Sequence, residues 1–92
     1  MAVILKENYD VFKIKPRNGK DFKLDELQKI VNGSIEIIDI PSRNMIMVIN
    51  ENGKYECNPN PIATEYAVKN HAIRLFDYIC GNVLLCESSM VL

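Results

Sequence analysis

The feature that most constrains this chain is an uninterrupted apolar run at 44–50, Asn-Met-Ile-Met-Val-Ile-Asn. Because side chains alternate between the two faces of a strand, Met47 lies on one face, whereas Ile46 and Val48 lie on the other. A short apolar run bounded by turn signals is typical of a buried strand, since helices normally run longer. The sequence therefore predicts a sheet that is covered on both faces and centred on 44–50.

This run is the middle of three strands predicted over residues 34–57. The preceding strand, 34–40, has isoleucines first at odd and then at even positions, so they fall on both faces of the strand. This change predicts a bulge or a twist near Ile37. The Pro-Ser-Arg-Asn segment at 41–44 is typical of a turn, because proline fixes φ. The first two of these strands are therefore expected to be neighbours.

A second turn signal follows the apolar run. The Asn-Gly dipeptide at 52–53 readily supplies the positive φ angles of a hairpin. Residues 54–57 are therefore expected to return antiparallel to 44–50. In this strand Tyr55 and Cys57 alternate with charged residues, which is the pattern of one buried and one solvated face.

The remaining chain predicts further short strands and two short helices. The first helix is expected at 24–31, where apolar residues recur at helical spacing, and Gly33 is typical of the C-terminal stop. The second helix is expected at 61–69, with Asn60 as N-cap and Pro61 at the first helical position. Further extended segments are predicted at 2–6, 9–15, 72–76 and 82–86.

The length of 92 residues allows one small domain, whose core buries about two thirds of the unfolded surface. A hydrophobic content of 48% with 25% charged residues is ordinary for a globular protein. We predict a single α+β domain over residues 1–92, with an antiparallel sheet of four or five short strands and two short helices.

The net charge of −1 gives no general attraction to nucleic acid or to an anionic membrane. The distribution is uneven, because residues 1–23 contain six basic and three acidic side chains, which leaves a local excess of three positive charges. Weak nucleic-acid binding through this basic N-terminal edge is an alternative function. A merely basic surface is the simpler interpretation, so nucleic acid is not expected as a partner.

Cys57, Cys80 and Cys86 are odd in number and have no CxxC spacing, so neither a disulfide framework nor a zinc site is indicated. Their apolar flanks favour free buried thiols in a reducing cytosol. No apolar run approaches the length of a membrane span, and the N-terminal run is too short for a signal peptide. We expect a cytoplasmic protein that has no metal and no cofactor.

Catalytic residues are not evident in the sequence. His71 is the only histidine and is expected at the surface beyond a helix end. The neighbouring acids Asp25 and Glu26 point to different faces of a helix, so no carboxylate pair for acid–base chemistry is indicated. No phosphate-binding loop or nucleophile elbow is present. A small enzyme with an unrecognised active site stays an alternative.

The most distinctive local chemistry is the Asn-Pro-Asn-Pro turn at the start of the helix 61–69. The free backbone amides of this helix and the side chains of Asn58 and Asn60 would suit an anion or a polar ligand. A nearby tyrosine would stack on a base, although core packing with a solvated hydroxyl is the alternative. Asn60 alternatively serves only as the helix cap. The predicted ligand-binding residues are Tyr55, Asn58, Asn60, Thr64 and Tyr66.

The order of several short motifs resembles the domain-of-unknown-function family numbered 3846. The motifs are Val-x-Gly before Ile-Glu, Asn-Glu-x-Gly in the turn, Asn-x-x-Ala-Thr at Asn60, Ala63 and Thr64, and Asp-x-Ile-x-Gly at Asp77, Ile79 and Gly81. Together they cover about residues 24–86. The resemblance implies a small accessory protein of a bacteriophage or mobile element inside a bacterial cell, and it implies no catalytic residues.

These observations favour a non-enzymatic accessory protein that binds a host protein or a small polar, nucleotide-like ligand. A binding protein is expected to show an exposed apolar or aromatic patch, whereas an enzyme needs titratable groups that converge in a cleft.

A homodimer is a further hypothesis, because two short helices leave part of a two-faced sheet uncovered. The apolar tail at 90–92 and the face around Tyr55 are its expected interface. The alternative is that the tail folds back on its own sheet.

Overall fold

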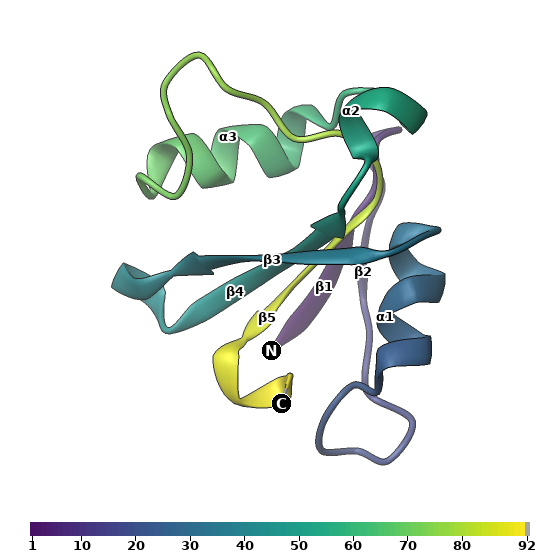
Figure 1. The fold of residues 1–92 in the computed structure, drawn as a ribbon. Helices are drawn as coiled ribbons and strands as arrows, with labels where there is room; N and C mark the ends of the chain where they lie inside the picture. Colours follow the sequence, from purple (N-terminus) through teal and green to yellow (C-terminus); the bar gives the residue numbers. More distant parts are fainter. Residues whose placement is uncertain (92) are drawn as a thin grey trace.

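The strands of this chain form one five-stranded antiparallel sheet in the order β2-β1-β5-β4-β3, as Figure 1 shows. This computed structural model describes residues 1–91. The strands are β1 (Ala2–Leu5), β2 (Val11–Lys13), β3 (Ile35–Ile40), β4 (Met45–Asn50) and β5 (Val83–Glu87). The helices are α1 (Leu24–Val31), α2 (Gly53–Glu56) and α3 (Pro61–Lys69), with 3-10 turns at Pro41–Arg43 and Ser88–Met90. The predicted α+β class is confirmed.

The strand β4 is buried on both faces, as its sequence predicts, because two apolar layers enclose the sheet. Met47 belongs to the layer beneath α3, and Val48 belongs to the layer beneath α1; both side chains are fully buried. Figure 1 shows α2 and α3 on one side of the sheet and α1 on the other. The central strand of the sheet is β5, with β4 beside it, so the expectation of a sheet centred on 44–50 is wrong by one strand.

The pairing of β3 with β4 is regular from Ile35 opposite Asn50 to Ile40 opposite Met45, so the bulge predicted near Ile37 is wrong. The change of apolar parity has another cause. In the uninterrupted pleat, Ile35 faces the α1 layer and Ile38 faces the α3 layer, and both layers are apolar.

The return strand predicted at 54–57 is also wrong, because residues 53–56 form the short helix α2. Both edges of β4 are already paired, one with β3 and the other with β5, so no edge is left for a third partner. The Asn50 side chain accepts a hydrogen bond from the backbone N–H of Asn52 at 2.7 Å and thereby turns the chain away from the sheet.

Both predicted helices, 24–31 and 61–69, have the expected bounds, because local signals determine their ends. The N–H of Lys23 donates to Glu26 Oε2 at 2.7 Å at the start of α1. Asn32, and not the predicted Gly33, ends that helix in the left-handed conformation, with φ of 61°. Asn60 caps α3, and Pro61 is its first residue.

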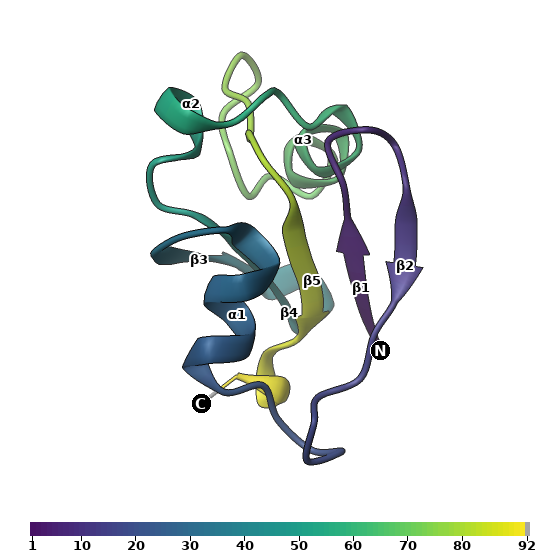
Figure 2. The same cartoon turned by 90° about the vertical axis from the view of Figure 1, so that its right-hand side faces the viewer.

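The C-terminal part of the chain confirms one predicted strand and not the other. Residues 82–86 largely coincide with β5, which lies between β1 and β4. Figure 2 shows β1 and β2 side by side, next to β5. Residues 72–76 form bends and turns instead of the predicted extended segment, and Figure 1 shows this connection looping above α3.

Within residues 1–91 the tail folds back on its own molecule. Phe22 donates its N–H to the carbonyl of Met90 at 2.8 Å, and Met90 and Val91 pack against the α1 layer. This supports the fold-back alternative for these two residues, whereas Leu92 lies outside the described residues. No helix in the described part of the chain is long and apolar enough to cross a membrane.

Candidate functional site

Asn60 lies in the interior and uses its whole side chain in hydrogen bonds. Its Oδ1 accepts from the N–H of Ala63 at 3.0 Å, while its Nδ2 donates to the carbonyls of Leu5 at 2.9 Å and of Gly81 at 2.7 Å. The residue is fully buried. It therefore ties the start of α3 to the end of β1 and to the entry of β5, as the helix-cap alternative predicts, and it has no donor left for a ligand.

Thr64 and Asn58 connect the same region in different directions. The Thr64 hydroxyl accepts from the N–H of Ile79 at 2.9 Å, which fixes the segment before β5 on α3. Asn58 is exposed and donates through its backbone and side-chain nitrogens to the Glu7 carboxylate at 3.2 and 3.3 Å. Because Glu7 and Glu56 line the small hollow beside Asn58, this place is unfavourable for an anion.

The two predicted tyrosines have different environments. Tyr66 is half-buried and packs against the α3 layer, as the core-packing alternative predicts. Tyr55 is on α2 and is 92% exposed. The structure therefore brings the buried Asn60 and the half-buried Thr64 together around Ile79, whereas Asn58 and Tyr55 line two different surface hollows.

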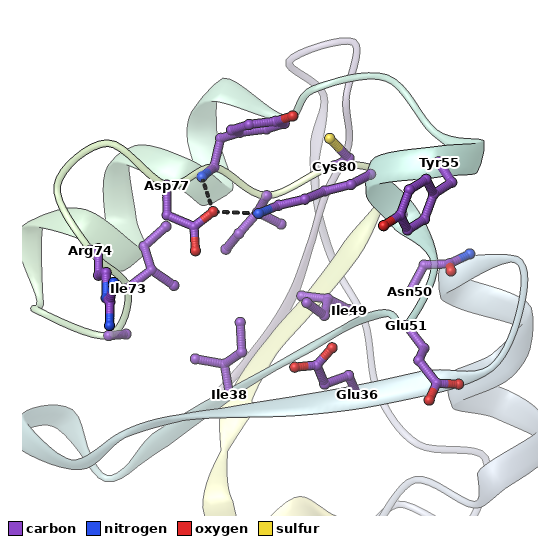
Figure 3. Close-up of a pocket in the computed structure, with 15 residues that line it drawn as sticks. Glu36, Ile38, Ile49, Asn50, Glu51, Tyr55, Ile73, Arg74, Asp77 and Cys80 are labelled. Atoms are coloured by element: carbon purple, nitrogen blue, oxygen red, sulfur yellow. Dashed lines mark hydrogen bonds and ion pairs between the residues drawn. The ribbon is translucent and has the colours of Figure 1, made fainter.

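Tyr55 contributes to a hollow of about 430 Å³ between the sheet and the segment 72–80. Figure 3 shows Ile38 and Ile49 on the sheet side, with Ile73, Arg74 and Asp77 on the opposite side. The other labelled residues that line it are Glu36, Asn50, Glu51, Tyr55 and Cys80. The hollow thus combines an apolar floor with charges of both signs.

An ion pair fixes the segment 72–80 on α2. Lys54 Nζ lies 2.5 Å from Asp77 Oδ1 and 4.8 Å from the centre of the Tyr78 ring, and the N–H of Tyr78 donates to Asp77 at 2.8 Å. The hydrogen bond from Lys54 lowers the pKa of Asp77, and the same bond raises the pKa of Lys54. Both pKa values move away from neutrality, which is unfavourable for acid–base catalysis.

Four exposed side chains belong to α2 and to the segment 72–80; we call Tyr55, Leu75, Phe76 and Tyr78 the aromatic rim, and of these Tyr55 and Tyr78 line the hollow. Phe76 is 93% exposed and Leu75 is 71% exposed, although both are apolar. Sequence reasoning missed these two residues, because Ala-Ile-Arg-Leu-Phe has the composition of a short buried strand. The signal that could have found them is the Asp-Tyr pair that follows, since Asp77 accepts the N–H of Tyr78 in a turn-like contact.

The cysteines and the histidine lie outside this cluster of exposed side chains, except that Cys80 lines the hollow. Cys80 and Cys86 are buried and Cys57 is half-buried, and burial raises the pKa of all three thiols, that of Cys86 to about 11. His71 is exposed in a turn after α3. Among residues 1–91, no group of three His, Cys, Asp or Glu side chains is arranged to hold a metal ion.

The basic N-terminal edge is partly neutralised by neighbouring acids. Arg17 Nη2 donates to both Asp25 oxygens at 3.0 and 2.9 Å, and Lys23 Nζ lies 3.2 Å from Asp21. The acid Asp25 lies outside the segment 1–23, so the positive excess of this edge is smaller in the folded protein than its sequence count suggests.

Comparison with known proteins gives one match. The family model described as "Domain of unknown function (DUF3846)" matches residues 1–90. No curated protein and no solved structure matches the chain.

Proposed function

The chain belongs to the family of the domain of unknown function DUF3846, and we propose that it is a non-enzymatic binding protein that docks a protein partner on its aromatic rim. The observation that carries this proposal is the exposure of Tyr55 on α2 and of Phe76 in the segment 72–80, each above 90%. Exposed aromatic side chains are among the residues that contribute most binding free energy when a partner buries them.

Two features support a protein as the partner. The rim side chains are exposed on two segments that the Lys54–Asp77 pair joins, so a protein surface can cover them together. A small molecule inside the hollow would leave Phe76 exposed to water, because Phe76 does not line the hollow. The pair of Lys54 and Asp77 also holds both segments of the rim before binding, which reduces the entropy lost on association.

The biological setting is part of the proposal. The family resemblance supports an accessory protein of a bacteriophage or mobile element, which acts in the bacterial cytoplasm on a protein of the host. The absence of a membrane-spanning helix within the described residues is compatible with that setting.

A second candidate function is the binding of a small polar, nucleotide-like ligand in the hollow. The observation that favours it is the combination of an apolar floor with polar side chains in one hollow. The three carboxylates of the lining outnumber its two cations, so the hollow favours a neutral polar group of such a ligand over a phosphate. The volume of about 430 Å³ falls within the range of small-molecule pockets.

Co-purification from a lysate of the host bacterium tests both functions. The wild-type protein is compared with Phe76→Ser and with the control Phe12→Ser, whose ring is 50% exposed on β2. We expect one host protein to be retained by the wild type and by the control and to be lost with Phe76→Ser. Equal retention by all three proteins would contradict docking on the rim, and a nucleotide in the small-molecule fraction would favour the second function.

A further inference from the structure

The outer edge of β3 has the features of a docking edge, unlike the opposite edge of the sheet. Within residues 1–91, no strand pairs with this side of β3, and Figure 1 shows the strand at the front of the sheet. The strand has six residues, is regular and contains no lysine or proline. The other edge strand, β2, has three residues, and Lys13, Lys15 and Pro16 at its end are typical guards against strand pairing.

The backbone groups that β3 presents outward follow from its pairing with β4. The N–H of Glu51 donates to the carbonyl of Ser34 at 2.8 Å, so these two residues form a hydrogen-bonded pair. Because hydrogen-bonded pairs alternate along an antiparallel ladder, Glu36 and Ile38 also direct their backbone groups toward β4. The groups that point outward therefore belong to Ile35, Ile37 and Asp39.

We propose that the β3 edge binds the β3 edge of a second copy of this chain, antiparallel and symmetric about Ile37. In this register Ile37 lies opposite Ile37 of the second copy, and Ile35 lies opposite Asp39 of the second copy. Every outward backbone group of the three residues then has a partner. The pairing also covers the Ile37 side chain, which is 45% exposed in the single chain.

The neighbouring symmetric registers are less favourable. A register symmetric about Glu36 places this residue opposite Glu36 of the second copy. A register symmetric about Asp39 likewise places two aspartates opposite each other. Like charges directly opposite each other are destabilising. The remaining register places Ile35 opposite Pro41 of the second copy, which has no N–H to donate. The register about Ile37 avoids all three faults.

The charges on the α3 side complement one another in this register. Glu36 of the second copy lies opposite Ile38 on the side of the sheet that carries the hollow. Figure 3 shows Arg74 at the end of the hollow above Ile38, away from Glu51 and Tyr55. Within residues 1–91 neither Glu36 nor Arg74 forms an ion pair. In the dimer, Glu36 of each copy pairs with Arg74 of the other.

Sedimentation equilibrium at micromolar concentration tests the proposal. We expect the wild-type protein to have twice the chain mass of 10.5 kDa. Ile37→Lys places two lysines opposite each other and should yield the monomer. The matched control is Val11→Lys, which changes a 51% exposed residue of β2 and should stay dimeric.

A charge reversal provides a second variant, which leaves the strand itself unchanged. Glu36→Arg and Arg74→Glu should each weaken the dimer, and the double variant should restore it. A monomeric wild type would overturn the proposal, as would an Ile37→Lys protein that stays dimeric or a dimer that dissociates only in Val11→Lys. A double variant as weak as the single ones would overturn the pairing of Glu36 with Arg74.

Discussion

Asn60 illustrates how one buried amide can determine the arrangement of three elements. Its oxygen caps α3 and its nitrogen satisfies two carbonyls, one at the end of β1 and the other before β5. Each of these hydrogen bonds adds little net stability when it forms. Losing one leaves a buried polar group without a partner, which destabilises the fold. The side chain of Asn60 therefore has a structural role.

Replacing Asn60 by alanine should lower the free energy of unfolding by about 2–5 kcal/mol, because one cap is lost and two carbonyls lose their donor. Urea denaturation followed by circular dichroism measures this change. Asn58→Ala is the control; its side chain is exposed, and its effect should stay within about 0.5 kcal/mol. Equal effects of the two substitutions would contradict the structural role.

The carboxylate of Asp77 should titrate below its ordinary pKa of 3.8, because Lys54 stabilises its charged form. A lowered pKa in the folded state means that this contact stabilises the fold above the pKa of the unfolded chain and is lost as pH falls through the folded pKa. NMR titration of the side-chain carboxyl measures the midpoint. Lys54→Met should raise it toward the ordinary value, and an unchanged midpoint would contradict the ion pair.

Elements whose ends depend on neighbouring residues could be predicted from the sequence. The helices α1 and α3 have the predicted bounds, because Asn32 and the Asn60-Pro61 pair act locally. The segment 54–57 could not be assigned correctly, because the second partner of β4 is β5, which begins only at Val83. An Asn-Gly turn indicates a hairpin only where an edge is free.

The candidate site was less predictable than the fold. Asn60 and Thr64 were identified as polar residues at a helix start, but their direction depends on the β1 and β5 segments that pack there. Phe76 was assigned to a strand, since composition alone does not distinguish a buried apolar run from an exposed one. The contacts that place this segment, such as the pair of Lys54 with Asp77 and the hydrogen bond of Ile79 with Thr64, join residues far apart in the sequence.

The burial of β4 is tested by Met47→Asp, which introduces a charge into the layer beneath α3. Met47 is fully buried, so the substitution should destabilise the protein by about 3–5 kcal/mol. Thermal unfolding measures the change, with Val11→Asp on the exposed strand β2 as the control. A protein that melts like the wild type after Met47→Asp would show that β4 is not interior.

Residues 1–91 cover both faces of the sheet with apolar layers and leave two notable surfaces exposed. One is the outer edge of β3, which we propose binds a second copy, and the other is the aromatic rim, which we propose binds a host protein. The residues that test them differ, since Ile37 is on the edge and Phe76 is on the rim. Loss of the dimer and loss of the partner can therefore be observed separately.

Hydrogen exchange of the complex with the co-purified host protein locates the docking surface. If the partner covers the rim, amides in residues 53–56 and 72–79 should exchange more slowly in the complex than in the free protein. Amides of β2, at the other edge of the sheet, should be unchanged. Protection confined to β2 and the basic segment that follows it, with residues 72–79 unchanged, would contradict binding through the aromatic rim.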